Sequence, residues 1–365
     1  MNRREFLSPR RLASVAGPVL ALADELESLP PEEAPSQQPV HLRFARKAMA
    51  TTFEVILPFG APSASASAQA ALDEIDRLEA QLTVYRDSSE VSRLNSRAAQ
   101  HPVRVEANLF ELLALAATLH RETEGAFDVS VGALIKAWGF FRRSGRVPTP
   151  QERAQVAERI GMQHVRLDPQ RQTVAFLRQG LELNLGSIGK GYALDRAAAL
   201  LQAMPPQPQP HSPGEERGVG ALLHGGHSSI LAIGNEGPGT HGWTVGLSDP
   251  QRPECRRALV RLRNRALATS AITHQHFEHE GKKLGHLLDP RTGWPADGML
   301  SASVTAPTAT VADALATAFF ILGIDKAKAY CEAHPEIGAA LIAADAPQRL
   351  VRIGRAVEEF DVLRA

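Results

Sequence analysis

Hydrophobic and polar positions follow two different periods along this chain. Some stretches place an apolar side chain every three or four residues, as an amphipathic helix does, and others alternate or form short β-rich runs, as strands do. The helical stretches are residues 64–83, 108–122 and 311–323. The strand-like stretches are residues 51–59, 165–177 (a hairpin), 228–234 and 242–250. Because these elements are interspersed without a regular βα alternation, the pattern predicts an α+β fold.

Two segments rich in proline and polar residues, 29–39 and 205–218, interrupt this pattern. The first predicts a linker, so we expect residues 1–40 to be an N-terminal extension or signal with its linker and residues 41–365 to be one folded domain. Strand-like runs resume directly after the second segment. We therefore expect 205–218 to be a flexible surface loop inside that domain.

The first residues, NRREFL (2–7), place a twin arginine before Phe and Leu, which is typical of a Tat export signal. An apolar run over residues 12–23 ends in Ala-Leu-Ala, but Arg10, Arg11 and Pro18 break the usual pattern. Two interpretations stay open: periplasmic export, which the twin arginine favours, and a cytoplasmic protein with an N-terminal extension. No apolar run approaches the roughly 20 residues of a transmembrane helix.

Charge and cysteine content narrow the function classes. Among the 365 residues, 40 are Lys or Arg and 40 are Asp or Glu, so no basic field indicates nucleic acid as a partner. An anionic ligand must then be held by local groups. The two cysteines, Cys255 and Cys331, have no neighbour at metal-ligand spacing and leave the redox compartment open.

Residues 181–204 predict an alternating strand, a glycine-rich turn and a helix. The turn LGSIGKG has neither the spacing of a P-loop nor that of a dinucleotide-binding fingerprint. A glycine turn that opens a helix still exposes backbone N–H groups at a positive dipole end, where Lys190 adds a point charge for phosphate. An ordinary tight turn would have the same glycines, so both interpretations stay open.

Two further segments contain candidate chemistry. His286 comes at the end of a strand-like run and beside an Asp289-Pro290 turn, as a general base or a packed histidine would. Asp313 and Thr317 are four residues apart, so a helix places them on one face, where they can supply oxygen ligands to magnesium. Alternatively, Thr317 bonds back to the carbonyl of residue 313 and Asp313 stabilises a helix N-terminus whose N-cap is Thr310.

Histidine clusters suggest a second kind of metal site. HGGH (224–227) and HQHFEH (274–279) resemble zinc-binding clusters. On a strand His274 and His276 share a face while His279 points to the other, so three-fold ligation would need a bulge. Zinc is therefore the weaker metal hypothesis.

Taken together and in this order, these segments resemble the FAD:protein FMN transferase (ApbE) family from Met49 to about Ile342. The segments that carry the resemblance are MATTFEV (49–55), YRDSSEVSRLN (85–95), GAFDVSVGALIKAWGF (125–140), LNLGSIGKGYALD (183–195), GGHSSILAIG (225–234), ALATS (266–270), HLLDPRTGWP (286–295) and ADALATAFFILG (312–323). The resemblance implies an α+β fold of mixed, largely antiparallel sheets packed with helices, of the ApbE or T-fold type. It also implies a magnesium-dependent enzyme that cleaves FAD, attaches FMN by a phosphoester bond to a threonine or serine of a target protein, and releases AMP.

The resemblance also assigns residues. It implies that Mg²⁺ is bound by Asp313, Thr317 and the backbone carbonyl of Ser187, and that His286 is the base for the attacking hydroxyl. It implies FAD contacts at Met49, Tyr85, Ala126, Phe127, Asp128 and Lys190. The expected partners are FAD and an acceptor protein with a Thr or Ser flavinylation site, with no nucleic acid, and peripheral association with a membrane redox complex is a further expectation.

The chain departs from the family pattern at a few positions. Asn184 stands where the signature usually has aspartate, Ala50 follows Met49 in place of glycine, Ala271 follows Ser270 where glycine is common, and His224 and Gly225 replace Asn-Ala. None of these changes removes an implied metal ligand. They leave two alternative functions, an FAD-binding protein and an FAD pyrophosphatase that yields FMN and AMP without transfer to protein.

Overall fold

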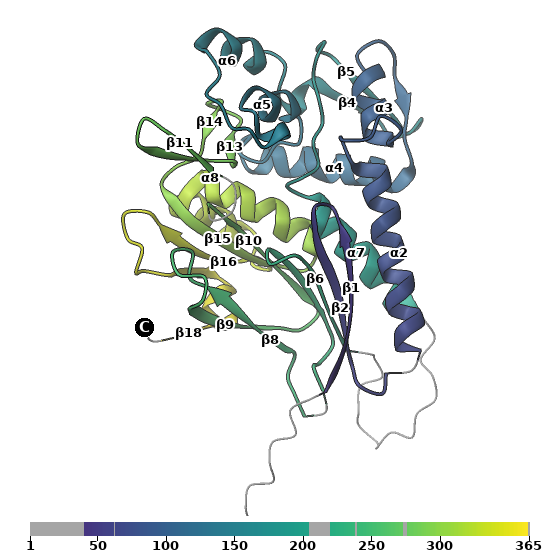
Figure 1. Ribbon diagram of the computed structural model, residues 1–365, viewed down its shortest axis with the longest axis vertical. Coiled ribbons are helices and arrows are strands. Elements are labelled where there is room, and N and C mark those ends of the chain that lie inside the picture. Colours follow the sequence, from purple (N-terminus) through teal and green to yellow (C-terminus); the bar gives the residue numbers. More distant parts are fainter. Residues whose placement is uncertain (1–39, 62, 204–219, 238, 273–275, 364–365) are drawn as a thin grey trace, which may run out of the picture. The chain divides into compact units, whose positions relative to one another are not determined.

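The computed structural model describes residues 40–61, 63–203, 220–237, 239–272 and 276–363 (Figure 1). The predictions for residues 1–39, for the loop 205–218 and for His274 concern positions outside the described residues. His41–Ala365 is one compact unit by its internal contacts. No helix in the described part of the chain is long and apolar enough to span a bilayer.

An eight-stranded sheet organises this unit, with strand order β1-β2-β6-β7-β10-β15-β16-β17. Its strands are β1 (His41–Ala48), β2 (Thr51–Pro58), β6 (Ala221–Gly225), β7 (Ser229–Ile233), β10 (Arg265–Ala271), β15 (Met299–Ala306), β16 (Gly338–Ala343) and β17 (Val351–Gly354). Every neighbouring pair is antiparallel. The predicted α+β class with largely antiparallel sheets is thereby confirmed.

Three helices cover one face of the large sheet: α2 (Ala64–Leu82), α7 (Gly189–Ala203) and α8 (Ala309–Ala333). In Figure 1, α8 lies across β10, β15 and β16, and α2 runs beside α7. Phe53 and Val55 of β2 are fully buried under these helices, as the period of two predicts for one face of a strand. This helix-covered face contains the larger hydrophobic core.

A smaller three-stranded sheet covers the opposite face. It consists of β8 (Trp243–Ser248), β9 (Arg256–Leu262) and β18 (Phe360–Val362), in the order β18-β9-β8. Ile56 of β2 and Leu222 of β6 pack here against Trp243 and Phe360 in a second core. Neighbouring residues of one strand thus enter different cores, so the large sheet is buried on both faces.

The remaining described elements form a helical region between β2 and β6 in the chain, together with hairpins near the C-terminal half. They are α3 (Glu90–Arg97), β3 (Val103–Arg104), α4 (Ala107–Glu122), α5 (Gly132–Ala137), η1 (Phe140–Arg142), α6 (Pro150–Ala157), η2 (Met162–His164), β4 (Val165–Asp168), β5 (Thr173–Phe176), β11 (His276–His279), β12 (Lys282–Gly285), β13 (Leu288–Asp289), β14 (Trp294–Pro295) and α9 (Ala356–Glu359). Leu134, Trp138 and Leu288 share a third core, and Trp138 Nε1 donates to the Gly293 carbonyl at 2.9 Å. The turn between β13 and β14 is thereby tied to α5.

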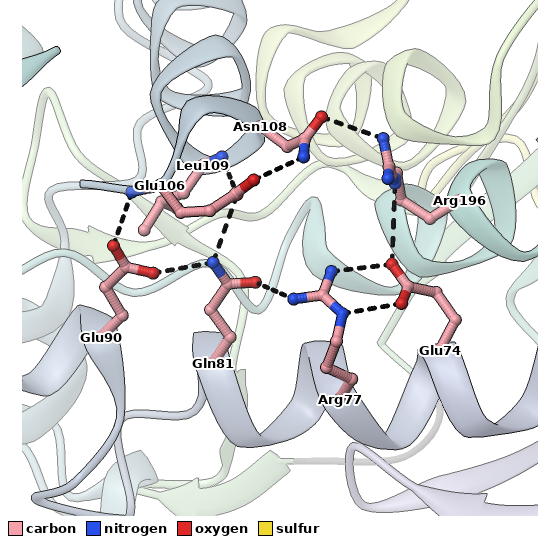
Figure 2. Close-up of polar contacts among 8 residues, drawn as sticks. All are labelled: Glu74, Arg77, Gln81, Glu90, Glu106, Asn108, Leu109 and Arg196. Carbon is pink, nitrogen blue, oxygen red and sulfur yellow. Dashed lines mark hydrogen bonds and ion pairs between the residues drawn. The ribbon is translucent and has the colours of Figure 1, made fainter.

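A polar network connects four of these helices (Figure 2). Arg196 of α7 donates to Asn108 Oδ1 of α4 at 3.0 Å, and its Nε lies 3.7 Å from Glu74 Oε1 of α2. Gln81 of α2 donates to Glu90 of α3 at 2.7 Å. Partly exposed pairs of this kind contribute about 0–1 kcal/mol each. Their main effect is therefore on how α2, α4 and α7 are placed against one another.

The strand predicted before the glycine turn is wrong. Residues 181–185 form only one isolated bridge, between Glu182 and Val131. The reason is that the Asn95 side chain takes both backbone groups of Leu183: its Nδ2 donates to the carbonyl at 2.9 Å and its Oδ1 accepts from the N–H at 2.8 Å. A side chain therefore occupies the place of a partner strand.

The helix predicted over 311–323 is longer at both ends. Its N-cap is Thr308, whose side chain accepts from Val311 N at 3.3 Å, so the prediction of Thr310 as N-cap is wrong. Gly323 has φ 77°, which commonly ends a helix, but here it forms a kink and the helix resumes to Ala333.

The turn between β1 and β2 generates a stability prediction. Met49 and Ala50 both have positive φ, 48° and 62°, as the central residues of a type I′ hairpin turn do. Glycine at position 50 would relieve the left-handed strain of Ala50, which is worth about 1–2 kcal/mol. The greater conformational entropy of glycine in the unfolded chain opposes this gain by about 0.5–1 kcal/mol. We expect Ala50→Gly to raise the free energy of unfolding by about 0.5–1 kcal/mol in urea titration, while Ala45→Gly within β1 lowers it. A destabilised Ala50→Gly protein would contradict the turn assignment.

Candidate functional site

The Asp313 carboxylate lies where α8 meets the beginning of α7. Its Oδ2 accepts from the Gly191 N–H at 2.9 Å and lies 3.4 Å from Lys190 Nζ, and its Oδ1 accepts from Ser229 Oγ of β7 at 2.7 Å. The side chain is buried. A carboxylate at a helix N-terminus is favoured by the helix dipole and by N–H groups that have no partner within the helix. Segments from three distant parts of the chain therefore converge on this one carboxylate.

Thr317 lies one turn further along α8 on the same face. Its Oγ1 donates to the Asp313 carbonyl at 3.4 Å and is 3.3 Å from Ser270 Oγ in β10. The back-bond to residue 313 is present but long, so the hydroxyl is held loosely and can serve another partner. The shared face that the spacing predicts for Asp313 and Thr317 is therefore observed, and it points toward hydroxyls of β7 and β10.

The glycine turn is held by hydrogen bonds from its own backbone N–H groups. Asn184 Oδ1 accepts from Gly186 N at 2.9 Å, which is a bond that an aspartate at this position could make as well. Ser187 lies between these residues and α7, and Gly189 N donates to the Leu185 carbonyl at 2.7 Å. At Gly191 a Cβ would lie 2.1 Å from the Ala309 carbonyl oxygen, so only glycine fits against α8 here.

The GAFD segment (125–128) comes just before Val129, whose carbonyl binds the residues that lead into the glycine turn. Asp128 is buried, which raises its pKa, while its Oδ1 accepts from Ser130 N at 2.7 Å and its Oδ2 is 3.4 Å from His120 Nδ1. The side chains of Ala126 and Phe127 are buried as well, so a ligand would meet these two residues through their backbone. Asn184 N donates to the Val129 carbonyl at 2.7 Å, which joins this segment to the glycine turn.

Tyr85 is largely exposed to solvent, whereas Met49 is half-buried. Tyr85 is 67% exposed and its ring stacks on Phe141 with 4.7 Å between centroids, while Lys136 Nζ lies 5.2 Å from the centre of the Phe141 ring. This is an aromatic platform open to solvent, of the kind on which a planar ring can stack. Met49 is half-buried at the β1–β2 turn.

His286 follows the last residue of β12 and is half-buried. The neighbouring Asp289 is used by the turn: its Oδ1 accepts from Arg291 N at 3.0 Å and its Oδ2 from Arg291 Nη2 at 2.8 Å. The turn interpretation of Asp289-Pro290 is thereby confirmed. His286 therefore lies just before a hydrogen-bonded turn, which the bond from Trp138 to Gly293 ties to the end of α5.

The histidine clusters give no support to zinc within the described residues, where no group of three or more His, Cys, Asp or Glu side chains could hold a metal ion. His224 Nε2 instead pairs with Glu54 Oε2 at 2.7 Å across β2 and β6. His227 is exposed in the β6–β7 turn, and His279 lies 3.8 Å from Glu280 in an exposed hairpin.

The oxygen atoms of Asp313 and Thr317 suit a hard cation such as magnesium better than zinc. A carboxylate, a hydroxyl and a backbone carbonyl are the oxygen ligands that Mg²⁺ takes. Each carboxylate oxygen of Asp313 accepts one close hydrogen bond, from Gly191 or Ser229, and a carboxylate has about four lone-pair sites. The residues present therefore fit a divalent cation.

Several residues that build this site were not predicted from the sequence. Ser229 and Ser270 contact Asp313 and Thr317, and Asp195 bonds the start of α8. No spacing rule identifies them, because their partners are 47 to 115 residues away in the chain.

Comparison with known proteins agrees with the motifs. A family model described as the ApbE family matches residues 49–342. A FAD:protein FMN transferase of Haemophilus influenzae is 31% identical over 295 residues, which cover 77% of this chain and 80% of that protein. One of Treponema pallidum is 32% identical over 292 residues, covering 77% and 79%. The crystal structure of the ApbE protein of Thermotoga maritima aligns with a TM-score of 0.77 at 26% identity, over 88% of this chain and 99% of that one. With a family match over most of its length and relatives above 30% identity, this chain belongs to the ApbE family.

Proposed function

We propose that this protein cleaves FAD and transfers FMN to a threonine or serine of an acceptor protein. In this reaction the acceptor oxygen forms a phosphoester bond to the FMN phosphorus, the pyrophosphate P–O bond to AMP breaks, and the hydroxyl proton passes to a base. The relatives from Haemophilus influenzae and Treponema pallidum are named for this activity. The observation that carries the proposal is the convergence of Asp313, Lys190 and the glycine turn at one point.

We assign magnesium binding to Asp313, Thr317 and the backbone carbonyl of Ser187. When bound, the cation would neutralise charge on pyrophosphate oxygens during in-line displacement. Lys190 and the positive end of the α7 dipole contribute positive charge to the same phosphates. These protein groups orient the pyrophosphate so that the acceptor hydroxyl can approach it in line.

The remaining assignments concern the flavin and the proton. Tyr85 offers an exposed ring, already stacked on Phe141, for a planar part of FAD. The proposed contacts of the dinucleotide are Met49, Tyr85, Ala126, Phe127, Asp128 and Lys190. His286 is the proposed base because it is a titratable side chain on a loop fixed by hydrogen bonds. Asn184 keeps its bond to Gly186 N, so the departure from aspartate leaves the turn intact.

The decisive experiment incubates the protein with FAD, magnesium and a target that carries an Asp-Gly-x-Thr acceptor sequence. Mass spectrometry of the target should show covalent addition of FMN, and AMP should appear in equal amount. AMP release without a mass change would identify an FAD pyrophosphatase. Bound FAD without turnover would identify a flavin-binding protein.

Asp313→Ala should abolish magnesium-dependent transfer. Metal stabilisation of a phosphoryl transition state is worth several kcal/mol, so we expect kcat/KM to fall by about 100-fold or more. The matched control is Asp325→Ala, which removes an exposed carboxylate of the same helix beyond the Gly323 kink and should leave the rate unchanged. Normal activity of the Asp313→Ala protein would refute the metal assignment.

His286→Ala should slow transfer while leaving FAD affinity intact. Loss of a general base costs about 10²–10⁴-fold in rate. FAD binding is followed by flavin fluorescence and transfer by the mass of the target, with the exposed His279→Ala as control. If FAD affinity collapses instead, His286 is a binding residue and not the base.

We also propose that the protein acts outside the cytoplasm, because NRREFL (2–7) carries the twin arginine of an export signal. Protein recovered from the native host should then lack the N-terminal segment, which intact-mass measurement reveals. A twin lysine variant of the same signal should stay in the cytoplasm at full length. A full-length protein in the cytoplasmic fraction of the wild type would contradict this assignment.

A further inference from the structure

We propose that Asp195 is a positioning residue for Asp313: by fastening the N-terminus of α8 to α7, it sets the affinity of the Asp313 site for a divalent cation. This inference rests on the metal-binding part of the proposed function. It assigns a role to a side chain that touches neither FAD nor metal in that proposal.

The contacts of Asp195 are unusually complete for a side chain that links two helices. Its Oδ1 accepts from the Ala309 N–H at 2.8 Å, and its Oδ2 accepts from the Thr310 N–H at 2.8 Å and from Thr310 Oγ1 at 2.5 Å. Burial raises the pKa of this carboxyl, and the bonds from Thr310 and Ala309 oppose that shift. All three hydrogen bonds come from the first two residues of α8.

This arrangement divides the capping of α8 between two parts of the chain. A helix begins with four N–H groups that lack partners within the helix. Thr308 serves one of them, since its side chain accepts from Val311 N at 3.3 Å. Asp195 serves two more, those of Ala309 and Thr310. The start of α8 is therefore fixed to α7 as well as to its own preceding residue.

A second attachment lies one helical turn away. Gly191 precedes Asp195 by four residues, so both face α8. At Gly191 the two helices touch directly, because a Cβ would be 2.1 Å from the Ala309 oxygen, and the Gly191 N–H donates to Asp313 Oδ2 at 2.9 Å. The two attachments lie at the same end of α8, so together they restrain sliding and rotation of this end against α7. Gly191 and Ser229 bond the Asp313 carboxylate directly, and Asp195 holds the helix end that carries it.

The rival explanation is that Asp195 only stabilises a helix end. Thr308→Ala separates the two explanations, because it removes a cap from the same end of α8 without touching the link to α7. We expect Thr308→Ala to lower the unfolding midpoint and to leave magnesium affinity unchanged. Asp195→Asn should instead weaken magnesium binding, since one amide cannot accept all three hydrogen bonds.

The experiment measures Mg²⁺ binding by calorimetry on the full-length protein, with and without FAD, beside thermal unfolding. Partners that orient a metal ligand are worth about 10–100-fold in metal affinity, and we expect a loss in this range for Asp195→Asn. FAD affinity without metal should not change. Thr310→Val, which deletes one of the three bonds without a loss of volume, should give a smaller loss in the same direction, and Thr310→Ser should restore wild-type affinity.

Each outcome is decisive. The inference is overturned if either Asp195→Asn or Thr310→Val binds magnesium as the wild type does, or if Thr308→Ala weakens binding as much as Asp195→Asn, whatever the stability of these variants. If Asp195→Asn does not fold, Thr310→Val decides alone. A wild-type protein that binds no magnesium, with or without FAD, would refute the proposed metal site itself, and this result is distinguishable because it does not depend on any variant.

Discussion

The Asp313 carboxylate is the constraint on which the site depends. A buried charge is costly unless hydrogen bonds compensate for its lost hydration. Here the compensation comes from the Gly191 N–H and the Ser229 hydroxyl, at 2.9 and 2.7 Å. These two donors belong to α7 and β7, so the charge can be buried only if α8, α7 and the large sheet come together in one arrangement.

The large sheet makes this arrangement possible because it is covered on both faces. Alternation along β7 and β10 sends Leu231 and Ala268 into the helix-covered core, and Ser229 and Ser270 lie on the same face as these residues. Hydroxyls at those two places meet Asp313 and Thr317. The polar site is therefore set into an otherwise apolar layer, and the small sheet seals the opposite face without contributing to it.

The sequence predicts those features that depend on local periodicity. The helix around Asp313, the hairpin at 165–177 and the strand over 51–59 follow from spacing alone, and so does the shared face of Asp313 and Thr317. Features set by distant partners could not be predicted. Residues 181–185 alternate like a strand, but Asn95 occupies the backbone of Leu183 from 88 residues away, and the N-terminus of α8 depends on Asp195, more than a hundred residues earlier. Nothing in the local pattern distinguishes Thr308 from Thr310 as the cap, because both are small hydroxyl residues before an apolar run.

The hydrogen-bond distances to the Asp313 carboxylate distinguish its neutral partners from its charged partner, Lys190. The neutral donors are at ordinary hydrogen-bond lengths, whereas Lys190 Nζ is 3.4 Å away, near the limit of a hydrogen bond. The carboxylate is therefore held in place by Gly191 and Ser229 and only balanced in charge by Lys190. It follows that the ammonium group can turn to an anionic ligand without releasing the carboxylate. A cation held by Asp313 would take over the role of counter-charge to the carboxylate, which would leave the Lys190 ammonium group available to an anionic ligand.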